Sequence, residues 1–484
     1  MEPRRAVTLR ADAPGQEFKV VAKSIPDREL SDAPSRGERR AEAKRIRASL
    51  AHFLSWWREY FDLQPRLEAL PDARKQGRAK IPQPAVLFAI LLMYWLGFGS
   101  VKALDDRLRH SATLRRLLAQ YGWSGGISDD TFADVLDGMD MEALRQVLYA
   151  IGKRALKRWA TGPYRDSVLG TRLAGVGCAG LVARPLVAID GHELFVTHSD
   201  KRTCSDCRVR KIKQKAPDGT ETVVEQHYHT IVVAQWVGVH PAVILDFEPI
   251  HPGEGEQIAA YRIVSRLEEV YGRAIGILVA DAAYDGEPFR KATRKAGYHY
   301  VIRHKNANID PGKALKRAVD KRDLERTAPD RRYNETASRR RYECWDEEDP
   351  ILGLRYIEAR RTTRAVRSDK ENFHKGACIT DLPREQAPAV AVAMMMETRW
   401  SIESAFHELV GEWSVDRAFV HTGRPTAVLA IACLAFMAYN ALATYMYRSL
   451  GINPRRPERT FGNIRDDLWE TLTEVGKKAR AHPS

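Results

Sequence analysis

Apolar residues recur every three or four positions through residues 48–165, the spacing that one face of an α-helix requires. The clearest examples are "LAHFLSWWREYF", "PAVLFAILLMYWL" and "MEALRQVLYAIGKRALKRW". Between them, "QGRAKIPQP" and "YGWSGGISDDTF" predict loops, and Ser128 or Asp129 is placed to cap a new helix. No charged residue occurs between Lys80 and Lys102, so we expect the middle helix to be buried. The pattern predicts an all-α region with a basic surface.

Residues 185–302 have a different pattern, in which short apolar runs end near glycine, proline or an acid. The runs "PLVAIDG", "HTIVVAQWV", "PAVILDFEPI", "AIGILVADAAYDG" and "YHYVIRH" predict strands, with "GVHP" as a hairpin connection. The stretches "EQIAAYRIVSRLEEVYG" and "EPFRKATRKAG" predict helices, and we expect the glutamates of the first to be exposed. This order predicts a mixed sheet with helices, an α/β fold.

An Arg-rich stretch, residues 303–370, interrupts the alternation of strands and helices. We interpret it as a basic, β-rich insertion that is closed by "GACITDLP". The helix "ETRWSIESAFHELVGEW" follows, and its apolar positions Trp400, Phe406, Val410 and Trp413 predict a buried stripe. Trp400 is therefore expected in the core.

Residues 427–447 carry no formal charge and are long enough to cross a bilayer. They are rich in alanine and contain Asn440 and Thr444, and no second strong span accompanies them. We expect a buried core helix and no membrane association, with a membrane span as the alternative.

The composition agrees with a folded protein of two or three domains, since 44% of the 484 residues are hydrophobic and 29% are charged. The formal net charge of +14 favours a polyanionic partner. Six cysteines are too sparse for a disulfide framework, and the N-terminus lacks the apolar core of a secretory signal. We therefore expect a cytoplasmic protein.

Three acids stand out against this background. Asp190 and Asp281 each end an apolar run, so we expect both at strand ends, and Glu403 fills a gap in the apolar stripe of its helix. Carboxylates gathered at one sheet edge repel one another unless cations neutralise them, and hard oxygen ligands suit Mg²⁺ or Mn²⁺. The alternatives are structural: turn or helix caps for the two Asp residues, and an i,i+4 ion pair between Arg399 and Glu403. Asp285 is an alternative second ligand.

The blocks "VAIDG", "LVADAAYD" and "RWSIESAF", in this order, resemble the three acidic blocks of bacterial insertion-sequence transposases of the DDE class. The resemblance covers about residues 185–445 and is closest to the group with a β-rich insertion before the Glu helix. It implies an RNase H-like catalytic core. That group spaces a Tyr, Arg, Glu and Lys along this helix. Arg399 and Glu403 occupy the Arg and Glu places, whereas Met396 and Val410 replace the Tyr and Lys.

The resemblance implies that Asp190, Asp281 and Glu403 bind two Mg²⁺ (or Mn²⁺) ions, and that Arg399 contacts phosphate or positions Glu403. Water would cut the transposon ends, and the released 3′-hydroxyls would then attack target DNA at the same site. The implied partners are the terminal inverted repeats and the target DNA, with a homodimer assembled on DNA in the nucleoid.

A second candidate metal site lies in "CSDCRVRKIKQKAPDGTETVVEQHYH". Cys204 and Cys207 form a C-x₂-C pair, and His227 and His229 follow, which suits a tetrahedral Zn²⁺ site. His198 could compete for a ligand position. The alternative is a pair of reduced cysteines on a loop between strands.

Arginine runs at 331–341 and 355–367 are interleaved with aromatic residues, a combination that suits DNA backbone and unstacked bases. Arg339, Arg340 and Arg341 are the candidate phosphate contacts. The alternative is a solvated charged surface.

The favoured function is a DNA transposase. The rivals are a metal-dependent nuclease that cuts without strand transfer and a catalytically degenerate, domesticated DNA-binding protein. The predicted order is a flexible basic segment (1–47), a helical DNA-binding domain (48–168), the first part of the catalytic core (185–302) with a zinc-binding loop (198–229), the β-rich insertion (303–385), the remainder of the core with the Glu helix (386–450) and a basic tail (451–484).

Overall fold

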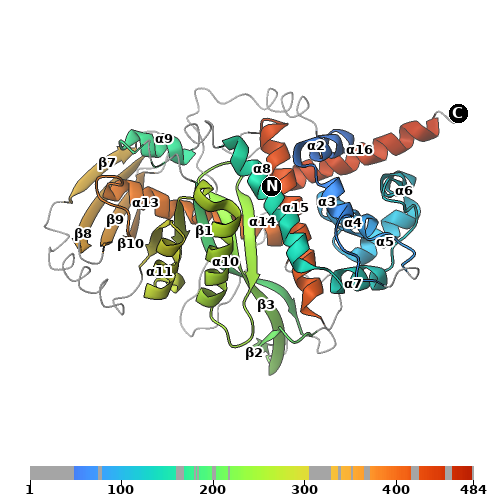
Figure 1. The fold of residues 1–484 in the computed structure, drawn as a ribbon, viewed down its shortest axis with the longest axis horizontal. Helices are drawn as coiled ribbons and strands as arrows, with labels where there is room; N and C mark the ends of the chain where they lie inside the picture. Colours follow the sequence, from blue (N-terminus) through green and yellow to red (C-terminus); the bar gives the residue numbers. More distant parts are fainter. Residues whose placement is uncertain are drawn as a thin grey trace.

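The fold was analysed in a computed structural model. It describes residues 48–74, 79–159, 168–178, 181, 185–198, 203–215, 219–304, 329–335, 339–349, 353–364, 371–415, 424–452 and 460–481. The predicted flexible segment 1–47 lies outside the described residues. A helical body, a central sheet and a set of outer strands follow one another along the long axis of the molecule (Figure 1).

The N-terminal part is helical, as its periodicity predicts. Ser128 caps a helix as expected, because its hydroxyl accepts the N–H of Thr131 at 3.3 Å. Every residue of the uncharged middle helix except Pro84 is buried. The helices of this part are α2 (Leu50–Phe61), α3 (Gln64–Glu68), α4 (Gln83–Leu96), α5 (Val101–His110), α6 (Ala112–Ala119), α7 (Asp129–Asp137), α8 (Met141–Trp159) and α9 (Val168–Gly175).

The centre of the molecule is one mixed sheet with the order β2-β3-β1-β5-β6-β10-β9-β8-β7, and β4 also pairs with β3. β1, β5 and β6 run parallel, and the remaining pairs are antiparallel. The predicted α/β fold is confirmed. The strands are β1 (Leu186–Thr197), β2 (Arg208–Lys215), β3 (Glu221–Val237), β4 (Val243–Pro249), β5 (Ile277–Ala280), β6 (His299–Arg303), β7 (Arg331–Glu335), β8 (Arg340–Asp349), β9 (Leu354–Arg364) and β10 (Glu371–Thr380).

The basic insertion is β-rich, and its strands extend the central sheet. β10 pairs with β6 through Cys378–Thr380, and β9, β8 and β7 follow outward. The insertion therefore joins the sheet at β6, which lies next to β5, the strand that leads into Asp281.

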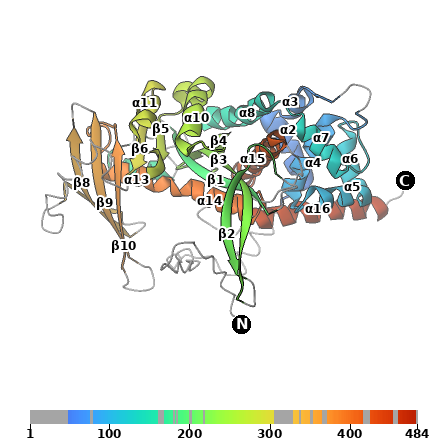
Figure 2. The ribbon, with the colours of Figure 1, turned by 90° about the horizontal axis from the view of Figure 1, so that it is seen from below.

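Helices cover both faces of the sheet (Figure 2). α10 and α11 lie on one side, and α14 lies on the other, against β1 and β3. These elements are α10 (Glu256–Tyr271), η3 (Gly272–Ala274), η4 (Ala282–Tyr284), α11 (Glu287–Lys295), α13 (Ala389–Thr398), α14 (Trp400–Gly411), α15 (Pro425–Arg448) and α16 (Phe461–Ala481).

The long apolar helix α15 is the core element that the sequence predicts. It is the one described helix that passes a length-and-hydropathy test for a membrane span by itself, and 89% of the tested window is buried inside the protein. Its Asn440 exchanges two 2.8 Å hydrogen bonds with the backbone of Ile244 in β4. Nε1 of Trp95 in α4 donates to the carbonyl of Ala438 at 3.1 Å. α15 thus joins the N-terminal helices and the sheet into one core.

Much of the predicted basic tail (451–484) is helical. Residues 461–481 form α16, which packs against α2 and α4. Ile464, Leu468 and Leu472 are buried along one face, at the spacing of an amphipathic helix. This apolar stripe was not predicted, because the many basic residues of the segment dominate its composition.

Candidate active site

Asp190 and Asp281 lie next to each other because their strands run parallel in register. Ile189 of β1 is opposite Ala280 of β5, and each acid is the next residue of its chain. β5 ends there, and Asp281 becomes the N-cap of η4. β1 continues to Thr197, because β3 still pairs with it. The prediction that Asp190 ends its strand was therefore wrong, although both acids do lie at the carboxyl end of β5.

α14, which packs on the face of the sheet opposite α10 and α11, brings Glu403 close to Asp190. Nη1 of Arg399 donates to Oδ2 of Asp190 at 2.9 Å, and its Nη2 donates to Oε1 of Glu403 at 2.6 Å. Arg399 is only 2% exposed. The i,i+4 ion pair considered from sequence exists, and the same guanidinium also holds a carboxylate 209 positions away.

The cluster carries more negative than positive charge. Burial raises the pKa of Asp190 to about 6; Arg399 lowers this pKa, and the charges of Glu403 and Asp281 raise it. Oδ1 of Asp281 is buried and has no hydrogen-bond partner among the described residues, although Nη1 of Arg303 lies 3.9 Å away. The side chains of Asp190, Asp281 and Glu403 are 17%, 24% and 31% exposed, so solvent reaches the cluster. Such a group of carboxylates favours added cations.

A fourth acid, Glu256, lies beside this cluster. A Cβ on Gly191 would lie 2.7 Å from Oε1 of Glu256, so the glycine after Asp190 leaves room for this carboxylate. Burial raises the pKa of Tyr284 well above its ordinary value, and the charges of Glu256 and Asp190 raise it further. The prediction of exposed glutamates was wrong for Glu256, which is half-buried. One feature of the sequence could have indicated this position: Glu256 lies in the first turn of the helix that follows the predicted hairpin.

A family model, described as the transposase DDE domain, matches residues 185–441, just over half of the chain. The match includes Asp190, Asp281 and Glu403. The chain belongs to the DDE transposase family. A comparison with curated proteins finds no significant match.

Membership gives the transposase an RNase H-like catalytic fold, a DNA substrate and the general activity of DNA cleavage and joining in transposition. The family generally uses divalent metal ions. The acid cluster of this transposase fits such ions, because its donors are carboxylate oxygens and one buried oxygen of Asp281 has no hydrogen-bond partner among the described residues.

Asp285, the alternative second ligand, has other partners in the transposase. Nη1 of Arg290 donates to its Oδ1 at 2.8 Å, and Nδ1 of His304 lies 2.6 Å from its Oδ2. All three side chains are buried. Asp285 therefore joins η4 and α11 to β6 and is less suited than Asp281 to bind an ion.

The three arginines considered as phosphate contacts differ in their surroundings. Arg339 and Arg341 are exposed at the start of β8. Arg340, on the opposite face of the strand from Arg341, turns toward α13, where its Nη1 lies 3.4 Å from Oε2 of Glu397. Arg340 is therefore directed toward the core, whereas Arg339 and Arg341 are exposed to solvent.

Glu397 is the centre of an ionic cluster that holds the insertion against the core. It accepts hydrogen bonds from Arg172 of α9 at 2.9 Å, from Arg361 of β9 at 2.8 Å and from the hydroxyl of Tyr342 at 3.0 Å. Burial opposes ionisation, but Arg172 and Arg361 lower the pKa of Glu397 below its ordinary value. The carboxylate is therefore charged and ties α9, β8 and β9 to α13.

Trp400 was expected in the core, and this prediction was wrong because its side chain is 51% exposed. The buried face of α14 passes through Ile402, Ala405, Phe406 and Leu409, whereas Trp400 is the first residue of the helix. Trp400 lines a cavity of about 430 Å³ together with Arg172, Arg340, Arg361 and His374. The Trp400 ring also meets Arg399, whose guanidinium carbon lies 5.4 Å from the ring centroid.

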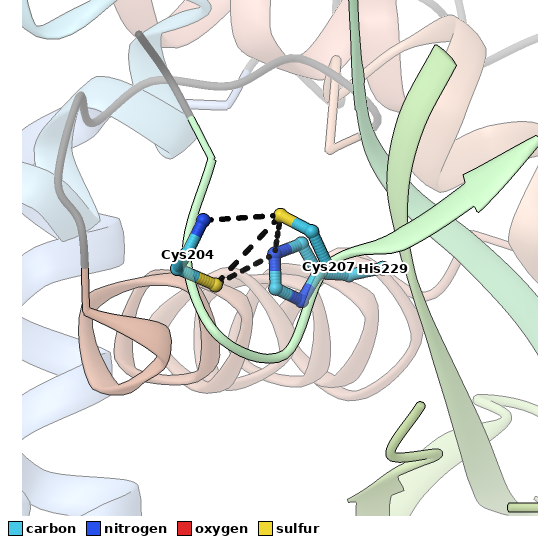
Figure 3. Close-up of side chains that lie close together, drawn as sticks. All are labelled: Cys204, Cys207 and His229. Carbon is cyan, nitrogen blue, oxygen red and sulfur yellow. Dashed lines mark hydrogen bonds between the residues drawn. The ribbon is translucent and has the colours of Figure 1, made fainter. Parts of the chain in front are cut away.

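Three of the four predicted zinc ligands converge. The potential ligand atoms of Cys204, Cys207 and His229 all lie within 4.8 Å of one another (Figure 3). His227, two residues earlier on β3, is not part of this group. The sequence pattern had not predicted β2 or the long extension of β3 that carries the histidine.

Proposed function

We propose that the transposase cuts transposon ends and joins the resulting 3′-hydroxyls to target DNA at one site formed by Asp190, Asp281 and Glu403. The observation that supports this proposal most strongly is that Asp190 and Glu403, from positions far apart in the chain, bind one buried guanidinium, with Asp281 next to Asp190 on the adjacent strand. Asp281 adds a third carboxylate whose buried Oδ1 accepts no hydrogen bond from the described residues and has only the Arg303 guanidinium 3.9 Å away, which supports a role beyond structure.

The side chains have distinct roles in this proposal. Asp190, Asp281 and Glu403 would hold two Mg²⁺ or Mn²⁺ ions, and Asp190 is the least exposed of the three acids. Bound ions would help to deprotonate the attacking water or 3′-hydroxyl and would stabilise the leaving oxygen. Arg399 orients Asp190 and Glu403 through its two hydrogen bonds and partly offsets their charge.

DNA would contact the exposed basic strands on either side of the acids. Five of the eight residues of β2 are Lys or Arg. The insertion adds the exposed residues Arg331, Arg332, Arg339, Arg341 and Arg364. Such contacts neutralise phosphates without reading sequence. Because two transposon ends must be joined to one target, we also propose a homodimer assembled on DNA.

A second candidate function is cleavage without strand transfer. Met396 and Val410 stand at the places of a Tyr and a Lys in the similar transposases, and neither offers a polar group to DNA. Loss of two such contacts would weaken the hold on a cleaved end before it meets the target.

The two functions differ in their products. Wild-type protein, Mg²⁺, labelled DNA with the element's own ends and a supercoiled target should give both cleaved ends and end–target joints. Cleaved ends without joints, also when pre-cut ends are supplied, would favour the nuclease. DNA binding with neither product in Mg²⁺ or Mn²⁺ would contradict both candidates and indicate a degenerate copy.

A further inference from the structure

Cys204, Cys207 and His229 present three soft ligand atoms to one point. The two Sγ atoms lie 3.8 Å apart, and Nε2 of His229 lies 3.4 Å from Sγ of Cys204 and 3.3 Å from Sγ of Cys207 (Figure 3). His229 is buried on β3, and the two cysteines lie in the turn before β2.

These distances match the edges of a zinc tetrahedron. With Zn–S of about 2.3 Å and Zn–N of about 2.0–2.1 Å, tetrahedral angles place two sulfurs about 3.8 Å apart and a sulfur and a nitrogen about 3.6 Å apart. The separations in the transposase agree with these edges to within about 0.3 Å. A disulfide would require the two sulfurs to approach to about 2.05 Å.

The turn between the cysteines is organised around the sulfurs. The N–H of Cys207 donates to the carbonyl of Cys204 at 3.2 Å, and the N–H of Cys204 donates to Sγ of Cys207 at 3.3 Å. Between them, Asp206 bonds Nδ1 of His251 at 3.1 Å, which ties the turn to the loop before α10. Backbone N–H groups directed at sulfur favour a thiolate, the form that binds metal.

We propose that Cys204, Cys207 and His229 bind one structural Zn²⁺ ion that fastens the turn before β2 onto β3. The described residues provide three of the four ligands of a tetrahedral site. Sulfur and imidazole select zinc, whereas the carboxylates of the acid cluster suit Mg²⁺ or Mn²⁺. The zinc site is therefore separate from the proposed catalytic site, and its existence does not depend on the proposed function.

The position of the ion gives it a mechanical role. β2 and the first half of β3 form a basic hairpin that projects from the body of the molecule (Figure 2). His229 lies at the base of this hairpin, four residues before Val233, the partner of Asp190. At about 3.4 Å per residue the distance along the strand is about 14 Å. The ion would fix the direction of the hairpin relative to the acids.

The test is the metal content of purified full-length protein. Wild type, His227→Ala and Asp190→Asn should each contain one zinc per chain, and Cys207→Ser and His229→Ala should contain none. His227→Ala is the matched control, because it removes a histidine two residues away on the same strand. The proposal would be overturned if wild type contains no zinc after exposure to Zn²⁺. It would also be overturned if Asp190→Asn loses zinc while Cys207→Ser keeps it. Loss of zinc from His227→Ala would overturn the three-residue assignment.

A measurement on wild type alone guards against variants that fail to fold. Cobalt bound in place of zinc should give the near-ultraviolet charge-transfer band of cobalt–thiolate bonds and the visible bands of a tetrahedral site. It should also protect Cys204 and Cys207 from alkylation. Cobalt binding without the charge-transfer band and without this protection would contradict the site.

Discussion

Replacing Asp190 by Asn is expected to stabilise the metal-free transposase at neutral pH. The pKa of Asp190 is raised to about 6 from an ordinary value of 3.8, chiefly by burial and despite Arg399. This difference means that ionising Asp190 costs about 3 kcal/mol more free energy in the folded state than in the unfolded state. Asn keeps an oxygen that can accept the hydrogen bond from Arg399, so the variant avoids most of this cost.

The sign of the pH dependence follows from linkage. The folded state binds the proton on Asp190 more tightly than the unfolded state, so the contribution of Asp190 to stability is greatest below about pH 4 and falls as pH rises to about 6. Above about pH 6 this contribution is fully lost. The variant should therefore match wild type near pH 4 and exceed it by up to about 3 kcal/mol at pH 7.5.

Thermal or urea unfolding in a metal chelator, across this pH range, measures the effect. Added Mg²⁺ should stabilise wild type and leave Asp190→Asn unchanged, because the variant lacks a ligand. If the variant is less stable than wild type at pH 7.5 without metal, the ion pair with Arg399 outweighs burial, and the description of an under-neutralised acid cluster is wrong.

Two further substitutions test the surroundings of the acids. Glu397→Ala leaves Arg172 and Arg361 without their shared carboxylate and should lower the free energy of unfolding by about 3–5 kcal/mol. The measurement is the unfolding midpoint, which should fall. A midpoint within error of wild type would contradict the proposed link between insertion and core. Gly191→Ala places a methyl group 2.7 Å from Glu256 and should cost about 1–3 kcal/mol, and adding Glu256→Ala should recover most of it. Failure of the second change to recover stability would mean that the methyl group meets something other than Glu256.

The pairing of Asp190 with Asp281 could be predicted from sequence because both follow apolar runs that form adjacent parallel strands. The period-two and continuous apolar patterns locate strands, and parallel strands bring their carboxyl ends together. Glu403 could be found because a carboxylate in an apolar stripe needs a partner. The pattern did not show that Arg399 serves Asp190 as well, since that contact depends on how α14 crosses β1.

Other features depend on long-range packing that local patterns do not encode. Trp400 fits the helical stripe, but it is the first residue of α14 and its side chain is 51% exposed. β2 is mostly Lys and Arg and has no apolar face, so nothing in its composition predicts a strand. It forms because the extended β3 offers unpaired backbone groups beside it. Glu256 was missed because its place beside the acids depends on a contact with Gly191, 65 positions earlier in the chain.

The most direct test of the account is Mg²⁺-dependent cleavage and joining of DNA that carries the element's own ends, with wild type beside Glu403→Gln. Glu408→Gln is the matched control, because Glu408 lies on the same helix and its carboxylate accepts a hydrogen bond from Tyr439 at 3.1 Å, which an amide oxygen can replace. The account predicts both products from wild type and control, and a loss of about 100-fold or more in Glu403→Gln with DNA binding retained. Equal products from wild type and Glu403→Gln would contradict it and leave Glu403 as the ion-pair partner of Arg399.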